Sequence, residues 1–291
     1  MEGRHASAAR LDDGGALAPP QIVGIVLVHN EDVFVERVIR NVAEFCDRIH
    51  AVDHVSTDRT WSVLRSLERE LDHLEARRTH HAGDSHRLIE SYAGSSTWVF
   101  GVDGDELYDP RRLALFRNEL LGGAHRDAFK IASNVLNCVE LDVRNQTASG
   151  YLSPPSRSIT KLYNFAAIES WTGDGSERLH GGKIVFRQGY DERAVDNIGE
   201  RLSWEDTPLR CLHACFLRRS SEDSRDEPSS ARPILEHSQL HDRSWRGAVK
   251  RVIRRPQPPA ETADWKRAKY MRGELVTVDA APFLAGSQSS A

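Results

Sequence analysis

Short apolar runs alternate with amphipathic stretches along the first hundred residues of the chain. Residues 22–28 form a continuous apolar run rich in β-branched side chains, which is typical of a parallel strand buried on both faces. Apolar residues then recur at helical spacing from about residue 32 to 46, which predicts a helix packed against that strand. The alternation continues with expected strands at 49–53, 75–79 and 98–102 and expected helices at about 58–74 and 85–93. This repetition predicts an α/β fold with a mostly parallel sheet and right-handed crossovers.

The pattern becomes less regular after Asp109-Pro110. A helix is expected over 111–121, and strands are expected within 128–141 and at 158–164, 182–187 and 210–217. Polar residues around Pro154-Pro155 predict a loop over 145–158, and a flexible loop is expected over 219–233. The two ends are expected to be a mobile tail at 1–20 and a peripheral tail at 255–291.

Composition restricts the class of protein. Hydrophobic residues are 39% and charged residues 28% of the chain, a balance that excludes a disordered or collagen-like protein. No apolar run approaches the roughly 20 residues of a transmembrane helix, and residues 1–20 lack the apolar core of a signal peptide. Four cysteines are too few for a disulfide framework, so a reducing, cytoplasmic setting is expected. A net charge of −4 with mixed signs argues against a nucleic-acid partner.

Polar residues gather directly after three of the expected strands. The clusters are His29-Asn30-Glu31, Asp53 with Ser56-Thr57-Asp58, and Asp103-Gly104-Asp105-Glu106. Ligands of an open parallel sheet bind outside the carboxyl ends of its strands, so the three clusters are expected to meet at one edge. Each cluster also has a structural interpretation, because Asp, Ser and Thr cap helices and shape turns.

The third cluster points to a metal site. Asp103, Asp105 and Glu106 would repel one another, and a bound divalent cation removes that cost. Hard cations such as Mg²⁺ are often held by one or two carboxylates together with substrate phosphates. Gly104 lets the backbone turn and approach closely. These residues therefore predict a metal ion that clamps a diphosphate.

In order along the chain, these motifs resemble the nucleotide-sugar-binding half of family 2 glycosyltransferases with the GT-A fold. The matching tracts are an apolar strand with Asn30-Glu31, then residues 53–60, then Gly83 with Arg87 four residues later, and then an apolar strand with Asp103-Gly104-Asp105. The resemblance covers about residues 21–110 and fades beyond them. It implies one GT-A domain with a Rossmann-like nucleotide-sugar-binding half at 21–110, a mixed acceptor half at 111–255 and a C-terminal extension at 256–291.

The resemblance also implies donor-site residues. Val28, His29 and Glu31 would border the base and ribose. Asp53 would accept a hydrogen bond from the base or ribose, and Arg87 would lie near the base or the diphosphate. Asp103 and Gly104 would face the ribose and the metal. Departures from the family pattern at His29, His54 and Val55 leave the nucleotide open, and a UDP-sugar is favoured.

The same resemblance implies a Mn²⁺ or Mg²⁺ ion with Asp105 as its direct ligand and Asp103 beside it. A further ligand would be a histidine far downstream, His180 or His213. A structural role is the alternative for His213. A zinc site with Cys211 and Cys215 is another alternative, although ligands two residues apart on one strand diverge poorly around one ion.

Inverting transfer needs a carboxylate that takes the proton of the acceptor hydroxyl. The candidates are Asp174 and Glu177, with Glu169 behind them. They lie in a glycine-containing stretch that starts at Trp171, whose ring could stack on a sugar. A solvated turn without a catalytic residue is the alternative for this stretch.

Together the motifs predict a hexosyltransferase-type enzyme that moves a sugar from a nucleoside-diphosphate sugar to a hydroxyl of a small-molecule or glycan acceptor. Metal dependence and inversion at the anomeric carbon are implied by the resemblance. The alternatives are a retaining GT-A enzyme, a phosphatase of the haloacid dehalogenase type, which also has Asp-x-Asp after an apolar strand, and a nucleotide-sugar-binding module without turnover. A basic amphipathic helix is expected at 240–254, and it could contact anionic lipid, a phosphorylated acceptor or the diphosphate, or only present a solvated face.

Overall fold

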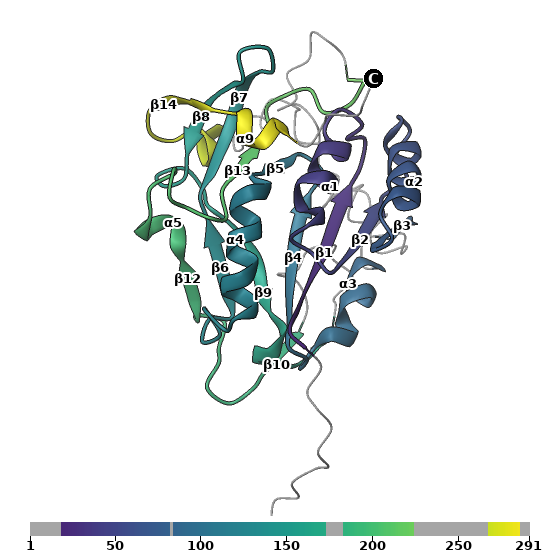
Figure 1. Ribbon diagram of the computed structural model, residues 1–291, viewed down its shortest axis with the longest axis vertical. Helices are drawn as coiled ribbons and strands as arrows, with labels where there is room; N and C mark the ends of the chain where they lie inside the picture. The colour runs from purple at the N-terminus through teal and green to yellow at the C-terminus, as the bar shows by residue number, and fades with distance from the viewer. Residues whose placement is uncertain (1–18, 82–83, 173–182, 224–266, 286–291) are drawn as a thin grey trace, which may run out of the picture.

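The computed structural model describes residues 19–81, 84–172, 183–223 and 267–285. A seven-stranded sheet in the order β12-β6-β9-β4-β1-β2-β3 forms the centre of this part of the chain (Figure 1). Neighbouring strands are parallel except at β9, which runs antiparallel to β4 and β6. The strands are β1 (Gln21–Val28), β2 (Arg48–Asp53), β3 (Leu74–Arg78), β4 (Thr97–Asp103), β6 (Lys130–Ser133), β9 (Ile159–Asn164) and β12 (Val195–Asn197).

Apolar side chains pack on both faces of this sheet. Successive strand residues point to opposite faces, so Ile22 and Val26 of β1 enter one hydrophobic cluster while Ile25 enters the other. The first cluster includes residues of α1, α2 and α4, and the second includes Ile89 and Trp171. The helices are α1 (Val35–Ala43), α2 (Thr60–Glu70), α3 (Asp84–Ile89), η1 (Glu90–Tyr92), α4 (Pro110–Leu121), η2 (Phe165–Ala167), α5 (Ile198–Arg201) and α9 (Ala281–Leu284).

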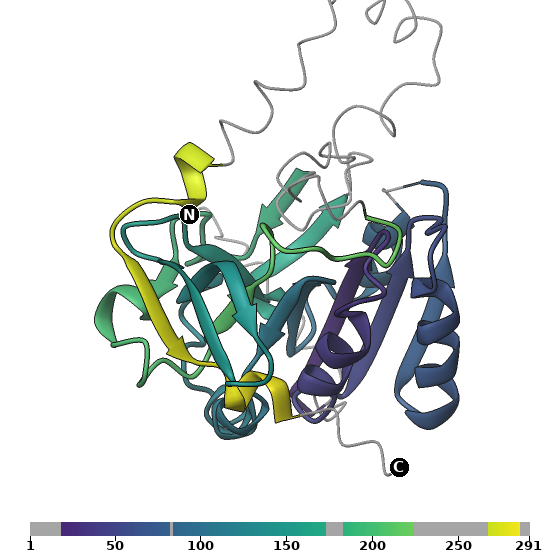
Figure 2. The ribbon, with the colours of Figure 1, turned by 90° about the horizontal axis from the view of Figure 1, so that it is seen from above.

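A second sheet begins where β4 ends. Its order is β14-β8-β7-β13-β5, and β5 is separated from β4 only by Gly104 and Asp105. In Figure 2, β14 (yellow) at the edge of this second sheet and α2 (blue) lie on opposite sides of the molecule. The remaining strands are β5 (Glu106–Tyr108), β7 (Val135–Asp142), β8 (Thr147–Leu152), β13 (Cys211–His213), β14 (Leu275–Asp279) and the antiparallel pair β10 (Ile168–Thr172) and β11 (Lys183–Phe186). The predicted α/β class, with helices flanking a mostly parallel sheet and a mixed second half, is confirmed.

The loop predicted over 145–158 is wrong in its first part, because residues 147–152 form β8 between β7 and β14. Its buried positions, Ala148 and Gly150, are small. They carry no hydrophobic signal even though they alternate as a strand requires. Conversely, the strand predicted over 210–217 is shorter than expected and covers only residues 211–213.

The described end of the chain is not a peripheral tail. β14 pairs with β8 along its whole length, and Phe283 of α9 is fully buried with its ring 5.8 Å from that of Trp204. The carbonyl of Phe283 also accepts a hydrogen bond of 2.9 Å from Asn41 Nδ2 on α1. β14 and α9, although short and rich in small residues, therefore complete the hydrophobic core.

In the described ranges, no helix combines the length and the hydrophobicity that a membrane span requires. The basic helix expected at 240–254 and residues 1–18 of the expected N-terminal tail lie outside the described residues.

Candidate active site

The three polar clusters meet at one edge of the large sheet. In the parallel register, Val28 lies beside Asp53, and Leu27 lies beside Asp103, so β1, β2 and β4 end together. The predicted convergence of their carboxyl ends is confirmed. The loops that carry His29, Glu31 and Asp105 therefore start at the same edge of the sheet.

Hydrogen bonds hold the first two loops together. Asn30 adopts a left-handed backbone with φ of 54°, and its N–H donates to Ser56 Oγ at 2.9 Å. The Asn30 side chain accepts from the N–H of Thr57 at 2.8 Å, and the N–H of Glu31 donates to Thr60 Oγ1 at 2.8 Å. The loop after β1 is thereby fixed on the loop after β2, with Glu31 only 6% exposed.

Asp53 has an internal structural role in this arrangement. It is fully buried, and its carboxylate accepts from the Ser56 N–H at 3.2 Å and from Arg78 Nε at 2.9 Å. A hydrogen bond from Asp53 to a base or ribose stays a prediction, and it would require one of these contacts to be exchanged. Ser56 serves the turn rather than the helix cap, while Asp58 accepts the Thr60 N–H at 2.8 Å at the start of α2.

The other expected donor residues differ in exposure. Val28 is buried, and His29 is half-buried with Nδ1 2.7 Å from the carbonyl of His54. Arg87 projects into solvent from α3 with 79% of its side chain exposed, and it pairs with Asp84 at 3.1 Å. The structure thus brings Val28 and His29 to the edge of the sheet and leaves Arg87 a solvent-facing group.

The turn between β4 and β5 gives its three carboxylates, Asp103, Asp105 and Glu106, different surroundings. A Cβ on Gly104 would lie 2.7 Å from Val28 Cγ1 and 3.1 Å from Glu31 Cγ, so only glycine fits there. Glu106 is fully buried, and its Oε2 accepts from the Asp103 N–H at 3.1 Å and from the Tyr108 hydroxyl at 3.3 Å. Burial beside Glu106 raises the pKa of Tyr108 well above its ordinary value, so its hydroxyl remains a donor. Glu106 therefore supports the turn, whereas Asp105 faces Arg219 and His213.

Arg219 joins Asp105 to Glu31. Its Nη1 lies 2.7 Å from Asp105 Oδ2 and 3.2 Å from Glu31 Oε1, and its side chain is largely buried. Burial lowers the pKa of Arg219, but the two carboxylates raise it to a greater extent, so the guanidinium is charged. The sequence analysis assigned no role to Arg219, which it placed in a flexible loop. The one sequence feature that could have drawn attention to it is the pair Arg218-Arg219, which closely follows His213.

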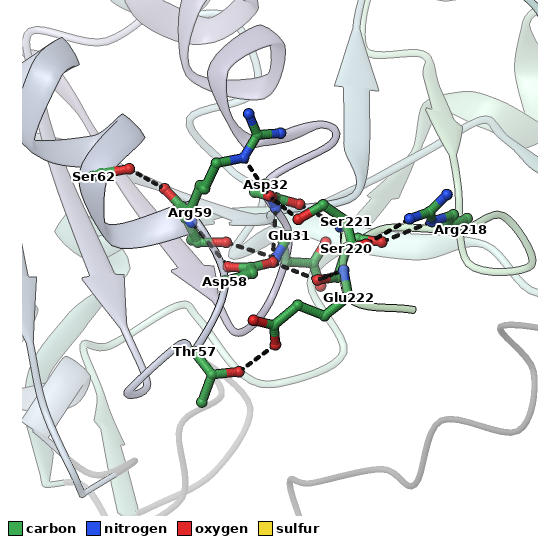
Figure 3. A network of polar contacts seen from close by, with 11 residues as sticks. Glu31, Asp32, Thr57, Asp58, Arg59, Ser62, Arg218, Ser220, Ser221 and Glu222 are labelled. Carbon is green, nitrogen blue, oxygen red and sulfur yellow. Dashed lines mark hydrogen bonds and ion pairs between the residues drawn. The ribbon is translucent and has the colours of Figure 1, made fainter. Parts of the chain in front are cut away.

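Residues 218–223, which we call the strap, cross the loops after β1 and β2 (Figure 3). The N–H and the hydroxyl of Ser221 donate to Asp32 at 2.7 and 2.6 Å. Ser220 donates to Asp58 Oδ2 at 2.6 Å, and Thr57 donates to Glu222 at 2.7 Å. Burial raises the pKa of Asp32, but the hydrogen bonds from Ser221 and from Arg59 lower it to a greater extent. The strap therefore covers both loops and carries Arg219 into the site.

His213 approaches Asp105 from the second sheet. It lies on β13, is 8% exposed, and places Nε2 3.8 Å from Asp105 Oδ1. An imidazole nitrogen and a carboxylate oxygen at this separation fit a divalent cation, with water or phosphate oxygens as its further ligands. The described residues contain no group of three or more His, Cys, Asp or Glu side chains placed to hold a metal ion. The zinc alternative gains no support, since β13 ends at His213 and the four cysteines, all buried thiols, are not arranged around it as a ligand set.

Of the expected catalytic bases, only Glu169 lies among the described residues. Asp174, Glu177 and the alternative metal ligand His180 lie outside the described residues. Glu169 is exposed on β10. The suggestion that Trp171 stacks on a sugar is wrong in this structure, because the side chain is 4% exposed and its ring lies 5.3 Å from that of Phe165.

No protein-family model matches the chain, and no curated protein matches it at a significant level. Among solved structures, a glucosyl-3-phosphoglycerate synthase from Mycobacterium tuberculosis, in complex with Mn²⁺, UDP and glucosyl-3-phosphoglycerate, is 20% identical over 41% of this chain, with a TM-score of 0.29. The match covers 44% of that enzyme's own length. A mannosyltransferase from Pyrobaculum calidifontis, in complex with GDP-mannose and Mn²⁺, is 14% identical over 95% of this chain and 75% of its own, with a TM-score of 0.36.

Proposed function

We propose that this chain is a metal-dependent GT-A glycosyltransferase that uses a nucleoside-diphosphate sugar. One observation carries the proposal: the loops after β1 and β4 bring Glu31 and Asp105 to one guanidinium at the carboxyl edge of a parallel sheet, and His213 reaches Asp105 from β13. That edge is where open α/β sheets bind nucleotides. The order of the sequence motifs and the shared position of their strand ends support the same assignment.

The charges around Asp105 explain why a cation belongs in this function. Glu31 and Asp105 carry two negative charges against one positive charge on Arg219, so a diphosphate alone would be repelled. Asp105 and His213 would hold a Mn²⁺ or Mg²⁺ ion, which when bound neutralises charge on the leaving nucleoside diphosphate. Arg219 orients the Asp105 carboxylate, and the hydrogen bonds between Asn30 and Thr57 keep the donor loops in place.

The remaining roles follow the family resemblance. Val28, His29 and Gly104 would line the donor, and Asp103 would face the ribose. UDP is the favoured nucleotide and inversion the favoured outcome. The acceptor, a small molecule or a glycan, would bind over the second half of the chain, which would also supply the base.

One observation favours a second candidate. It is a nucleotide-sugar-binding module without turnover, because Arg219 pairs with both Glu31 and Asp105 and thereby neutralises part of the charge that would attract a catalytic cation. A phosphatase of the haloacid dehalogenase type is disfavoured, because the β1–α1 and β2–α2 units precede the Asp-x-Asp strand, whereas in that type this strand usually opens the domain.

A thermal-shift panel tests the proposal. UDP, GDP and dTDP are each added with and without Mn²⁺ to the wild type, to Asp105→Asn and to the surface control Asp142→Asn. A ligand at 100 times its Kd adds about 2.7 kcal/mol to the free energy of unfolding. One nucleotide should stabilise the wild type and the control only with Mn²⁺, and should not stabilise Asp105→Asn. Donor assays then separate transfer, which releases nucleoside diphosphate, from a binding module, which releases nothing. Phosphate release from a phosphomonoester would contradict the proposal.

A further inference from the structure

The ring of His213 is held between two strands of the second sheet. On β5, Glu106 is its antiparallel partner, and on β7, Asn137 is its parallel partner. Asn137 is fully buried, and its Oδ1 lies 3.0 Å from His213 Nδ1. The ring of Tyr270 packs edge-on against the imidazole with 5.7 Å between the ring centroids. The imidazole is thus fixed in position by residues distant in the sequence.

The amide of Asn137 has one orientation that satisfies its partners. Nδ2 donates to Ser156 Oγ at 2.8 Å and more weakly to the carbonyl of Tyr151 at 3.4 Å. The Ser156 hydroxyl donates its proton to the carbonyl of Tyr270 at 2.7 Å, so Ser156 Oγ accepts from the side-chain amide of Asn137. Oδ1 must therefore face His213, and because an amide oxygen only accepts hydrogen bonds, Nδ1 must carry the proton.

This chain of hydrogen bonds determines what His213 presents to the site. With the proton on Nδ1, the neutral imidazole has its lone pair on Nε2, the atom 3.8 Å from Asp105 Oδ1. In the neutral ring, the Nε2 lone pair and the Asp105 carboxylate would both be available to a cation placed between them. Gly150 supports the same geometry, because a Cβ at that position would lie 2.3 Å from the backbone carbonyl oxygen of Asn137.

We propose that Asn137, anchored by Ser156 and the backbone of Tyr270, is a positioning residue that fixes the Nδ1–H tautomer of His213 and aims Nε2 at Asp105. The use of that nitrogen as a metal ligand rests on the proposed function. The tautomer itself does not. Hydrogen bonds to the non-ligating nitrogen orient metal-binding histidines and raise their basicity, and their loss typically weakens metal binding by about 10- to 100-fold.

The tautomer is read by long-range ¹H–¹⁵N NMR of the full chain without metal, at a pH where the ring is neutral. The His213→Gln spectrum assigns the signal. We expect Nδ1 to be protonated in the wild type and the two tautomers to mix in Asn137→Ala. Asn134→Ala removes another buried asparagine, one bonded to Thr207, and should leave the signal unchanged. A wild-type ring protonated on Nε2 would overturn the proposal.

Metal affinity is measured separately, from the free Mn²⁺ signal in electron paramagnetic resonance with no nucleotide present. Asn137→Ala should bind Mn²⁺ about 10- to 100-fold more weakly. Asn137→Asp retains the acceptor and should recover most of the affinity, and Ser156→Ala should lose part of it. If Asn137→Ala does not fold, the Mn²⁺ affinity of Ser156→Ala and the tautomer of the wild type still test the proposal. Equal affinity in all variants would overturn the positioning role. Wild-type protein that binds no Mn²⁺ but shows the expected tautomer would instead contradict the proposed function.

Discussion

The guanidinium of Arg219 lies 2.7 Å from the carboxylate of Asp105, a residue 114 positions earlier in the chain. The same nitrogen reaches Glu31 at 3.2 Å, so one cation links the end of β1 to the turn after β4. Both carboxylates are nearly inaccessible to water, and each needs a positive partner. Arg219 supplies that charge in the metal-free protein, and a bound divalent cation would compete with it.

Replacing Arg219 tests this competition. Arg219→Gln leaves two buried carboxylates without their cation, so the free energy of unfolding should fall by about 3–5 kcal/mol in metal-free buffer. Mn²⁺ should restore part of that loss and should stabilise the variant more than the wild type. Urea unfolding with and without Mn²⁺ measures both effects. Arg40→Gln, which also removes a guanidinium from two carboxylates, Glu36 and Glu70, but at a more exposed position, is the matched control. A variant as stable as the wild type without metal would show that the ion pairs contribute little.

The contacts of Asp32 make the strap sensitive to acid. Burial raises the pKa of this carboxyl, but hydrogen bonds from Ser221 and Arg59 lower it to a greater extent, so the folded pKa lies below the ordinary value. The stabilisation is therefore complete above the unfolded pKa and disappears as the pH falls through the folded pKa, in the range below about pH 4. The protection factor of the Ser221 amide, which is its exchange rate compared with the intrinsic rate at the same pH, should fall in that range. Asp32→Asn should exchange rapidly already at neutral pH. Unchanged exchange in the variant would place the strap's anchorage elsewhere.

Replacing Gly104 by alanine should destabilise the β4–β5 turn for a steric reason. The added methyl of Gly104→Ala would overlap Val28 and press on the Glu31 side chain, so the β4–β5 turn must shift. Overpacking of this kind typically costs about 1–3 kcal/mol. Unfolding by urea should show that loss, and nucleotide binding should weaken further because Glu31 is displaced. Wild-type stability and binding would mean that the turn accommodates a side chain.

The local hydrophobic pattern was sufficient to predict the elements that carry the proposed donor site. The apolar run of β1 and the helical spacing of α1 predicted their positions within about three residues at each end, and the order of strand ends predicted the meeting of Glu31 with Asp105. The pattern could not reveal that Asp53 is neutralised by Arg78, because that partner belongs to another strand.

The elements that were missed depend on distant partners. Arg219 reaches Glu31 across 188 positions, which no local spacing encodes. β8 was missed because small residues, not hydrophobic ones, alternate along it. α9 was missed because Phe283 is buried by contacts with Trp204 and α1 rather than by a periodic apolar face of its own.

The most direct test is anomalous diffraction at the manganese edge from crystals grown with Mn²⁺ and UDP. A peak should lie within coordination distance of both Asp105 and His213 and contact the diphosphate, with Arg219 no longer bridging Asp105 and Glu31 as it does in the metal-free protein. UDP bound without such a peak, or a metal bound away from Asp105, would contradict a cation-assisted sugar transfer at this site.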